Sequence, residues 1–296
     1  MTTTFDGYQE RIAAGEPLAP DVIGSLAAAP DILPLGMLAD AQRRRAHGTR
    51  VTYLRVADCG FDASFADAVP APAREVRITG VPASLDVALS AVQAARAVAG
   101  NRAVSGYSWK TVMQLSETSG TRRLEVLRKL RAAGLDAVAE LALDVMENVD
   151  EAIELLQKAG FDRLRLTIDR LPASGRVGLL LRVPEWQQRF GCIAAINPLP
   201  LALNAFRPTT GYEDVKMVAV ARLAAPDVAH VQVDWRRYGP KLAQVALTFG
   251  ADDIDGISAS DASPEGRRRA PLEEIRRNIQ AAGFEPAERD GKFEVV

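Results

Sequence analysis

From residue 49 onward, short apolar runs alternate along the chain with longer amphipathic segments. Most of the short runs are bounded by Gly, Asp or Pro, which is typical of β-strands. The longer segments carry apolar residues at helical spacing, as Leu124, Leu127 and Leu130 do. We therefore predict eight strands, at residues 51–56, 75–79, 103–107, 136–143, 163–168, 192–197, 230–235 and 253–258.

The segments between these strands have the end signals of helices. Ser84 can cap the helix that follows it, and Gly100 is a suitable stop for the same helix. The segment 174–191 is less regular because Pro184 interrupts it. Residues 6–48 also follow a helical pattern, which ends at Gly48.

Strands that alternate with helices predict parallel pairing through right-handed crossovers. A chain of this length behind a helical prefix fits an α/β fold of the TIM type, a (β/α)8 barrel. A doubly wound open sheet is the alternative, but no G-x-G-x-x-G turn follows the first strand. We divide the chain into an N-terminal helical extension, residues 1–48, and a single-domain barrel with a C-terminal tail, residues 49–296.

Composition excludes several classes of protein. The 296 residues are 48% hydrophobic and 25% charged, with a net charge of −2, which argues against a nucleic-acid partner. No apolar run approaches the length of a membrane span. The first residues show no signal-peptide pattern and the chain has only two cysteines, so we expect a cytoplasmic protein without membrane contact.

In a (β/α)8 barrel the functional site is built at the carboxyl ends of the strands. Polar and aromatic residues of both charge signs collect there in this sequence. Such a ring favours a small polar organic ligand that carries carboxylate or hydroxyl groups. The candidate ligand-binding residues are Tyr107, Trp109, Asn197, Arg207, Gln232, Asp234, Trp235 and Asp255.

Two carboxylates are candidates for general acid–base chemistry. Glu140 lies within an apolar strand and could face the barrel lumen, and Asp169 directly follows a strand. Arg207 or Arg236 could then bind a substrate carboxylate. The alternative for Glu140 is a structural ion pair with an arginine of a neighbouring strand, such as Arg165.

The sequence predicts no metal site. His47 and His230 lie far apart along the chain and lack H-x-H or H-E-x-x-H spacing, so we interpret both as structural. Cys59, placed in a loop after the first strand, could be a nucleophile, but a buried free thiol is the alternative that we favour.

Three C-terminal segments resemble the menaquinone-pathway radical-SAM enzymes: PTTGYEDVKMVAVARL at 208–223, GPKLAQVALTFGADDIDG at 239–256 and IRRNIQAAGFEPAERDGKF at 275–293. The chain is most similar to aminofutalosine synthase and dehypoxanthine futalosine cyclase, and the deazaflavin-cofactor synthases are more distant. The resemblance implies a TIM-type barrel, a [4Fe–4S] cluster and S-adenosylmethionine. It also suggests ligand contacts at Gln232, Asp234, Trp235 and Asp255.

The chain departs from this family where the cluster would bind. The family carries Cys-x3-Cys-x2-Cys after its first strand, whereas the corresponding stretch ADCGFDASFADAVPAP holds Cys59 alone. Cys192 is expected on the sixth strand, and two cysteines cannot supply three thiolate ligands. We therefore expect neither the cluster nor S-adenosylmethionine as a cofactor here.

Three functions remain open at this point. The chain could bind a futalosine-type intermediate or pair with an active radical-SAM enzyme of menaquinone biosynthesis without catalysis of its own. It could be a lyase or hydrolase that needs no cluster and uses Glu140 or Asp169 as general base. It could also be a barrel with an unrelated ligand.

Overall fold

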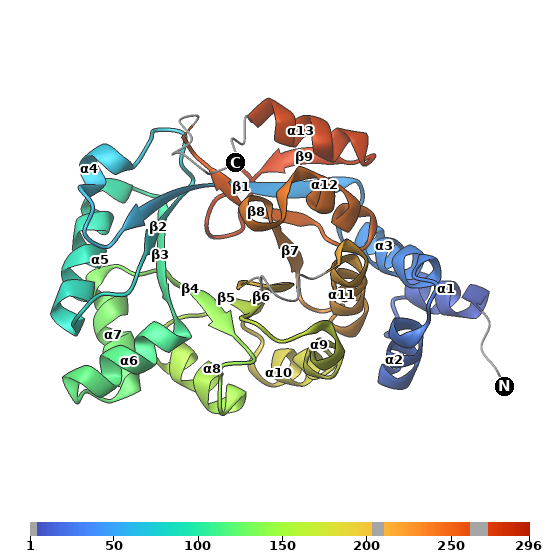
Figure 1. Cartoon of the computed structure of the whole chain (residues 1–296), viewed down its shortest axis with the longest axis horizontal. Coiled ribbons are helices and arrows are strands. Elements are labelled where there is room, and N and C mark those ends of the chain that lie inside the picture. The colour runs from blue at the N-terminus through green and yellow to red at the C-terminus, as the bar shows by residue number, and fades with distance from the viewer. Residues whose placement is uncertain (1–4, 203–209, 261–271) are drawn as a thin grey trace.

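A computed structural model describes residues 5–202, 210–260 and 272–296 (Figure 1). Arg207, one of the predicted ligand contacts, lies outside these ranges. Three helices precede the barrel: α1 (Phe5–Ala14), α2 (Pro20–Ala28) and α3 (Leu33–His47). Helix α3 ends at Gly48, which has a positive φ of 61°, as the helix-stop signal predicted.

The predicted barrel is confirmed, since strands β1 to β8 pair in parallel and in chain order, and β1 also pairs with β2 to close the ring. All eight strand predictions overlap an observed strand. The strands are β1 (Arg50–Gly60), β2 (Glu75–Thr79), β3 (Ala103–Ser108), β4 (Ala137–Ala142), β5 (Leu164–Ile168), β6 (Ile193–Pro200), β7 (His230–Asp234) and β8 (Asp253–Ser258).

Helices surround the barrel, as Figure 1 shows. Ser84 caps α5 through its hydroxyl, which accepts from the backbone N–H of Val87. The irregular segment around Pro184 forms two helices, and the proline occupies the first turn of the second. The helices are α4 (Phe65–Ala68), α5 (Leu85–Ala99), α6 (Trp109–Ser119), α7 (Arg123–Ala133), α8 (Val149–Lys158), α9 (Ala173–Leu180), α10 (Val183–Phe190), α11 (Gly211–Ala224), α12 (Trp235–Thr248) and α13 (Leu272–Ala281).

A ninth strand, β9 (Glu285–Glu288), adds to the amino-terminal part of β1. Residues Arg50–Tyr53 of β1 pair with β9, and residues Val56–Gly60 pair with β2. The long β1 therefore has a different neighbour at each end of the barrel. Because of this pairing, the C-terminal tail lies at the amino end of the barrel, where Arg289 is fully buried.

The N-terminal helices pack on the barrel's own helices. Leu35, Leu38 and Ala39 of α3 have no exposed surface, and α3 lies against α11. These are apolar positions at helical spacing, so α3 contributes to the same hydrophobic core as the barrel helices. Within the described ranges, no helix combines the length and the apolar character that crossing a membrane would require.

Candidate functional site at the carboxyl end of the barrel

The two predicted catalytic carboxylates line one small cavity. Glu140 lies on β4 and Asp169 comes directly after β5, so both side chains stand at the carboxyl ends of adjacent strands. The cavity has a volume of about 90 Å³, and its wall also includes Ser108, Trp109 and Lys110. The structure therefore brings Glu140, Asp169 and Trp109 together around one space.

Glu140 is held by an arginine that the sequence did not single out. Nη2 of Arg237 donates to Oε1 of Glu140 over 2.9 Å, and Nη1 donates to the carbonyl oxygen of Leu201 over 3.0 Å. Arg237 also lies 3.3 Å from Oδ2 of Asp234. The suggested partner Arg165 pairs elsewhere. Glu140 is therefore ion-paired, but about a third of its side chain is exposed and open to a ligand.

The loop that carries Asp169 is fixed by another carboxylate. Asp144 accepts hydrogen bonds from the backbone N–H groups of Asp169, Arg170 and Leu171, over 2.7 to 2.9 Å. The Asp169 side chain lies 3.2 Å from the exposed Arg170 and is 30% exposed. Asp144 therefore positions the loop, and the carboxylate of Asp169 stays accessible at the cavity.

Asp234 caps α12 at the end of β7. Its Oδ1 accepts from the backbone N–H of Arg237 over 3.0 Å, which brings the guanidinium of Arg237 over the barrel mouth. Gly256 makes room for this carboxylate, because a Cβ there would lie 2.8 Å from Oδ1 of Asp234. Burial raises the pKa of Asp234, while Arg237 acts against the rise.

Other predicted ligand contacts serve the fold. The hydroxyl of Tyr107 donates to the carbonyl oxygen of Ala88 on α5 over 3.0 Å, so this ring is directed into the helical layer. Asn197 is buried and accepts from the backbone N–H of Leu199. Trp235 is 1% exposed, at the start of α12. As placed, none of the three has its polar atom at the cavity that Glu140 and Asp169 line.

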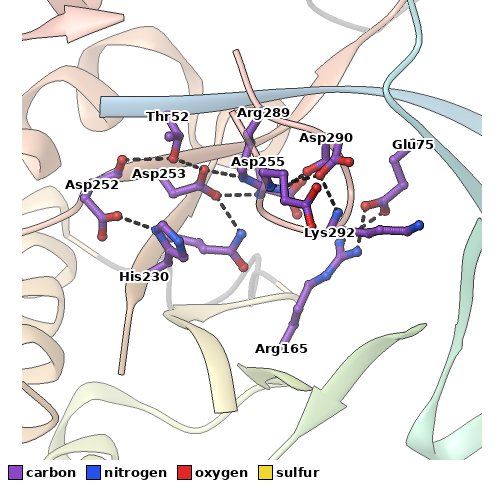
Figure 2. A network of polar contacts seen from close by, with 12 residues as sticks. Thr52, Glu75, Arg165, His230, Asp252, Asp253, Asp255, Arg289, Asp290 and Lys292 are labelled. Atoms are coloured by element: carbon purple, nitrogen blue, oxygen red, sulfur yellow. Dashed lines mark hydrogen bonds and ion pairs between the residues drawn. The ribbon is translucent and has the colours of Figure 1, made fainter. Parts of the chain in front are cut away.

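Asp255 belongs to a polar network deeper in the lumen, which Figure 2 shows together with Asp253 and Arg289. Gln232 joins the same network through Asp253. Asp255 forms an ion pair with Arg77 over 3.0 Å. Gln232 donates a hydrogen bond to Oδ2 of Asp253. The guanidinium of Arg289 donates hydrogen bonds to both carboxylate oxygens of Asp253, over 2.6 and 2.7 Å. These contacts engage the amide nitrogen of Gln232 and the carboxylate of Asp255 within the protein itself.

The third ion pair of this network joins Glu75 and Arg165. Both nitrogens of the Arg165 fork reach the carboxylate, at 2.6 and 3.1 Å, and the hydroxyl of Ser105 donates to it over 2.6 Å. Burial alone would raise the pKa of Glu75, but Arg165 and Arg77 outweigh it and hold the pKa well below its ordinary value. Glu75 and Arg77 stand two residues apart on one strand, a spacing that could have identified them as lumen residues.

The residues present do not fit a [4Fe–4S] cluster. Cys59 lies within β1, not in the loop that the sequence predicted, because β1 continues to pair with β2 as far as Gly60. Its sulfur lies 3.8 Å from the carbonyl oxygens of Ala57 and Ala68, and burial raises the pKa of its thiol. Cys192 directly precedes β6 at the opposite end of the barrel. The two thiols therefore cannot share one cluster.

The two histidines, interpreted from the sequence as structural, lie side by side. The rings of His47 and His230 stack with their centroids 5.5 Å apart, and Asp252 lies between their nitrogens. Helix α3 brings His47 to the first residue of β7 at the amino end of the barrel. No spacing in the sequence shows this pairing, because the two histidines are 183 positions apart (230 − 47).

Comparison with known proteins agrees with this reading of the fold. Residues 202–296 match the family described as the CofH/MqnC C-terminal region. The solved structure of methylornithine synthase superposes with a TM-score of 0.66 at 15% identity and covers 97% of this chain and 98% of that one. At this identity the match supports the (β/α)8 fold alone.

The curated relatives come from two branches, the tyrosine 4-hydroxyphenyl transferases and the futalosine-type synthases. A 5-amino-6-(D-ribitylamino)uracil–L-tyrosine 4-hydroxyphenyl transferase of Archaeoglobus fulgidus is 30% identical over 244 residues, which are 72% of this chain and 71% of the relative. The cyclic dehypoxanthine futalosine synthase of Streptomyces coelicolor is 28% identical over 195 residues, 57% of this chain and 49% of the relative. The aminodeoxyfutalosine synthase of Thermus thermophilus is 29% identical over 181 residues, 58% and 44% respectively.

These identities do not separate the two branches, although the sequence motifs favoured the futalosine side. They do establish the wider family that the motifs predicted. With its closed barrel and its matching C-terminal region, this chain belongs to the CofH/MqnC family of futalosine-synthase and tyrosine-transferase relatives.

Proposed function

We propose that this chain is a cluster-free member of its family that binds a small polar ligand of the futalosine type at the carboxyl end of the barrel. The observation that carries the proposal is the cavity shared by Glu140 and Asp169 at adjacent strand ends. Its relatives are named for futalosine compounds and for a ribityl-bearing uracil.

The chemistry of the cavity wall supports a ligand with hydroxyl groups. Glu140 and Asp169 offer carboxylate acceptors, Lys110 offers an ammonium group, and Trp109 provides an apolar surface beside them. Ligand sites combine such an apolar wall with a few converging polar groups. The volume of about 90 Å³ suits one end of a ligand, such as a hydroxyl-bearing sugar, rather than a whole nucleoside.

The cysteine count supports the absence of a radical step. Radical generation in the resembled family needs three thiolates on one cluster, and this chain has two cysteines at opposite ends of the barrel. The pKa of both thiols is raised, that of Cys192 to about 11, chiefly by burial, whereas a cluster ligand is a thiolate.

Calorimetric titration tests the binding proposal. The purified chain is titrated with aminodeoxyfutalosine, with cyclic dehypoxanthine futalosine and with 5-amino-6-(D-ribitylamino)uracil. We expect binding of one of these, weakened about tenfold or more by Glu140→Gln, since a hydrogen bond to a charged group contributes about 1.5–3 kcal/mol. Glu154→Gln on the exposed face of α8 is the matched control and should bind as the wild type does. No binding of any of the three compounds would overturn the proposal.

The same cavity supports a second candidate, a lyase or hydrolase that needs no cluster. Two carboxylates at one space could divide the roles of acid and base. If turnover of a futalosine-type compound is found, Glu140→Gln or Asp169→Asn should lower kcat by about 10²-fold or more. Turnover unchanged in both variants would exclude this candidate, while binding with no turnover would leave the first.

Partnership with an active radical-SAM enzyme is a further form of the first proposal. A ligand-binding barrel without its own cluster could hold an intermediate for such an enzyme. Co-purification of the chain with a futalosine-pathway radical-SAM enzyme from the same cell, retained after size-exclusion chromatography, would support it. Separate elution of the two proteins with and without ligand would contradict it.

A further inference from the structure

We propose that His47, His230 and Asp252 form a binding site for a divalent transition-metal ion of the zinc type at the amino end of the barrel. The site lies at the opposite end of the barrel from the ligand cavity and does not depend on the proposed function. It departs from the expectation, drawn from sequence spacing, that the chain has no metal site. The three side chains come from the end of α3, the start of β7 and the residue before β8.

The ligand atoms already converge. Nδ1 of His230 lies 2.6 Å from Oδ2 of Asp252, and Nε2 of His47 lies 3.5 Å from the same oxygen. One nitrogen from each imidazole and one carboxylate oxygen all lie within 4.8 Å of one another. Zinc bonds of about 2.0–2.2 Å bring ligand atoms to separations of this order, so small side-chain rotations complete the geometry.

The surroundings orient the carboxylate toward the two imidazoles. The guanidinium of Arg222 and the backbone N–H of Val231, over 2.8 Å, both donate to Oδ1 of Asp252. Oδ2 is thereby left to face His230, as Figure 2 shows, and His47. Partners of this kind on the non-ligating oxygen fix a metal-binding carboxylate in its productive orientation. Arg222 also offsets the charge of Asp252, which should weaken the attraction of this carboxylate for a cation.

The two imidazoles leave a path by which a metal ion can reach the site, and their nitrogens can bind it. Side chains of His47 and His230 are 20% and 14% exposed, whereas Asp252 is 2% exposed, so an ion can enter from the histidine side. Nε2 of His47 lies 2.8 Å from the carbonyl oxygen of Ala229, and transfer of its proton to Nδ1 frees the Nε2 lone pair.

The other face of the site is closed by the C-terminal tail. The ring of Phe293 stacks on His230 with centroids 5.0 Å apart. Three protein ligands then leave one position of a tetrahedral ion for water, which is the arrangement of an open zinc site. Imidazole and carboxylate together suit Zn²⁺, Ni²⁺ and Co²⁺ better than Mg²⁺ or Ca²⁺, which prefer oxygen ligands alone.

The chain offers a simple test because His47 and His230 are its only histidines. The chain without any affinity tag is titrated with Zn²⁺ by calorimetry. We expect one ion per chain and at least tenfold weaker binding in His47→Gln and in His230→Gln. Cys192→Ala, which removes the thiol at the same end of the barrel, is the control and should bind Zn²⁺ as the wild type does.

A spectroscopic measurement on the unaltered chain covers the case in which a variant does not fold. Cu²⁺ at one equivalent should give an electron paramagnetic resonance spectrum with nitrogen splitting from two imidazoles. Absence of stoichiometric Zn²⁺ binding by the wild type would overturn the proposal. Wild-type affinity in both histidine variants, or a copper spectrum without nitrogen ligands, would also overturn it.

Discussion

The two ends of the barrel use charged side chains differently. Toward the amino end, Glu75 and Asp253 have no exposed side-chain surface and their charges are matched by Arg165 and Arg289. At the carboxyl end, Glu140 and Arg237 also form an ion pair, but about a third of each side chain is exposed. The same chemical pairing is therefore sealed at one end and accessible at the other.

This difference distinguishes charges that are held inside the protein from charges that a ligand could reach. A sealed carboxylate cannot exchange its arginine for a ligand without leaving a buried charge unpaired, which is costly. An exposed pair such as Glu140–Arg237 contributes little to stability and can exchange partners when a ligand arrives. The amino end should therefore determine folding stability, and the carboxyl end should determine ligand binding.

The largest expected effect on stability comes from removing Arg289, which follows β9 in the C-terminal tail. Arg289→Ala should lower the free energy of unfolding by about 3–5 kcal/mol, because it leaves Asp253 buried without its partner. Urea denaturation followed by circular dichroism measures the change. The matched variant at the other end, Arg237→Ala, should cost less than about 1 kcal/mol. Equal losses in the two variants would remove the distinction between the ends.

Acid should lower the free energy of unfolding by protonating the buried carboxylate of Glu75. Because the pKa of Glu75 in the folded chain lies below its ordinary value of 4.5, this group contributes stability above about pH 4.5 that is lost as the pH falls below that value. Urea denaturation at pH 7, 4.5 and 3 measures this dependence of the free energy of unfolding. In Glu75→Gln the decline between pH 4.5 and 3 should be shallower, and an unchanged slope would contradict the assignment.

A smaller change in stability, with a clear change in binding, is expected at the open end. Arg237→Met releases Glu140 from its partner and removes a cation beside the cavity. Affinity for the futalosine-type ligand should fall about tenfold, equivalent to 1.4 kcal/mol, as measured by calorimetry. Wild-type affinity in this variant would show that the ion pair does not shape the binding site.

The smallest effect is expected at Cys59. Cys59→Ala removes a buried sulfur that packs near α4, so stability should fall by about 1 kcal/mol. Ligand affinity should not change, because the sulfur does not line the cavity of Glu140 and Asp169. A loss of ligand binding in a folded Cys59→Ala chain would place this thiol in the functional site.

Local patterns were sufficient for the barrel. The period of apolar residues and the end signals such as Ser84 and Gly48 are properties of neighbouring residues, so the eight barrel strands and most of the helices followed from them. Strand β9 was not predicted, because the residues EPAE have no strand pattern of their own and pair only with a strand that lies far away in sequence.

Contacts between distant residues set the limits of the site prediction. Glu140 and Asp169 could be placed together because parallel strands bring their carboxyl ends to one edge. The sequence interpretation suggested Arg165 as an ion-pair partner of Glu140, which was wrong. The partner is Arg237, which reaches Glu140 from the first turn of α12 rather than from a strand. The proximity of His47 and His230 depends on how α3 docks on the barrel, which no local pattern encodes.

Anaerobic iron–sulfur reconstitution of the purified chain, with iron counting and an assay for S-adenosylmethionine cleavage, tests the central claim most directly. We expect no stoichiometric cluster and no cleavage, because the chain has two cysteines at opposite ends of the barrel. About four irons per chain in a cluster that cleaves S-adenosylmethionine would contradict it.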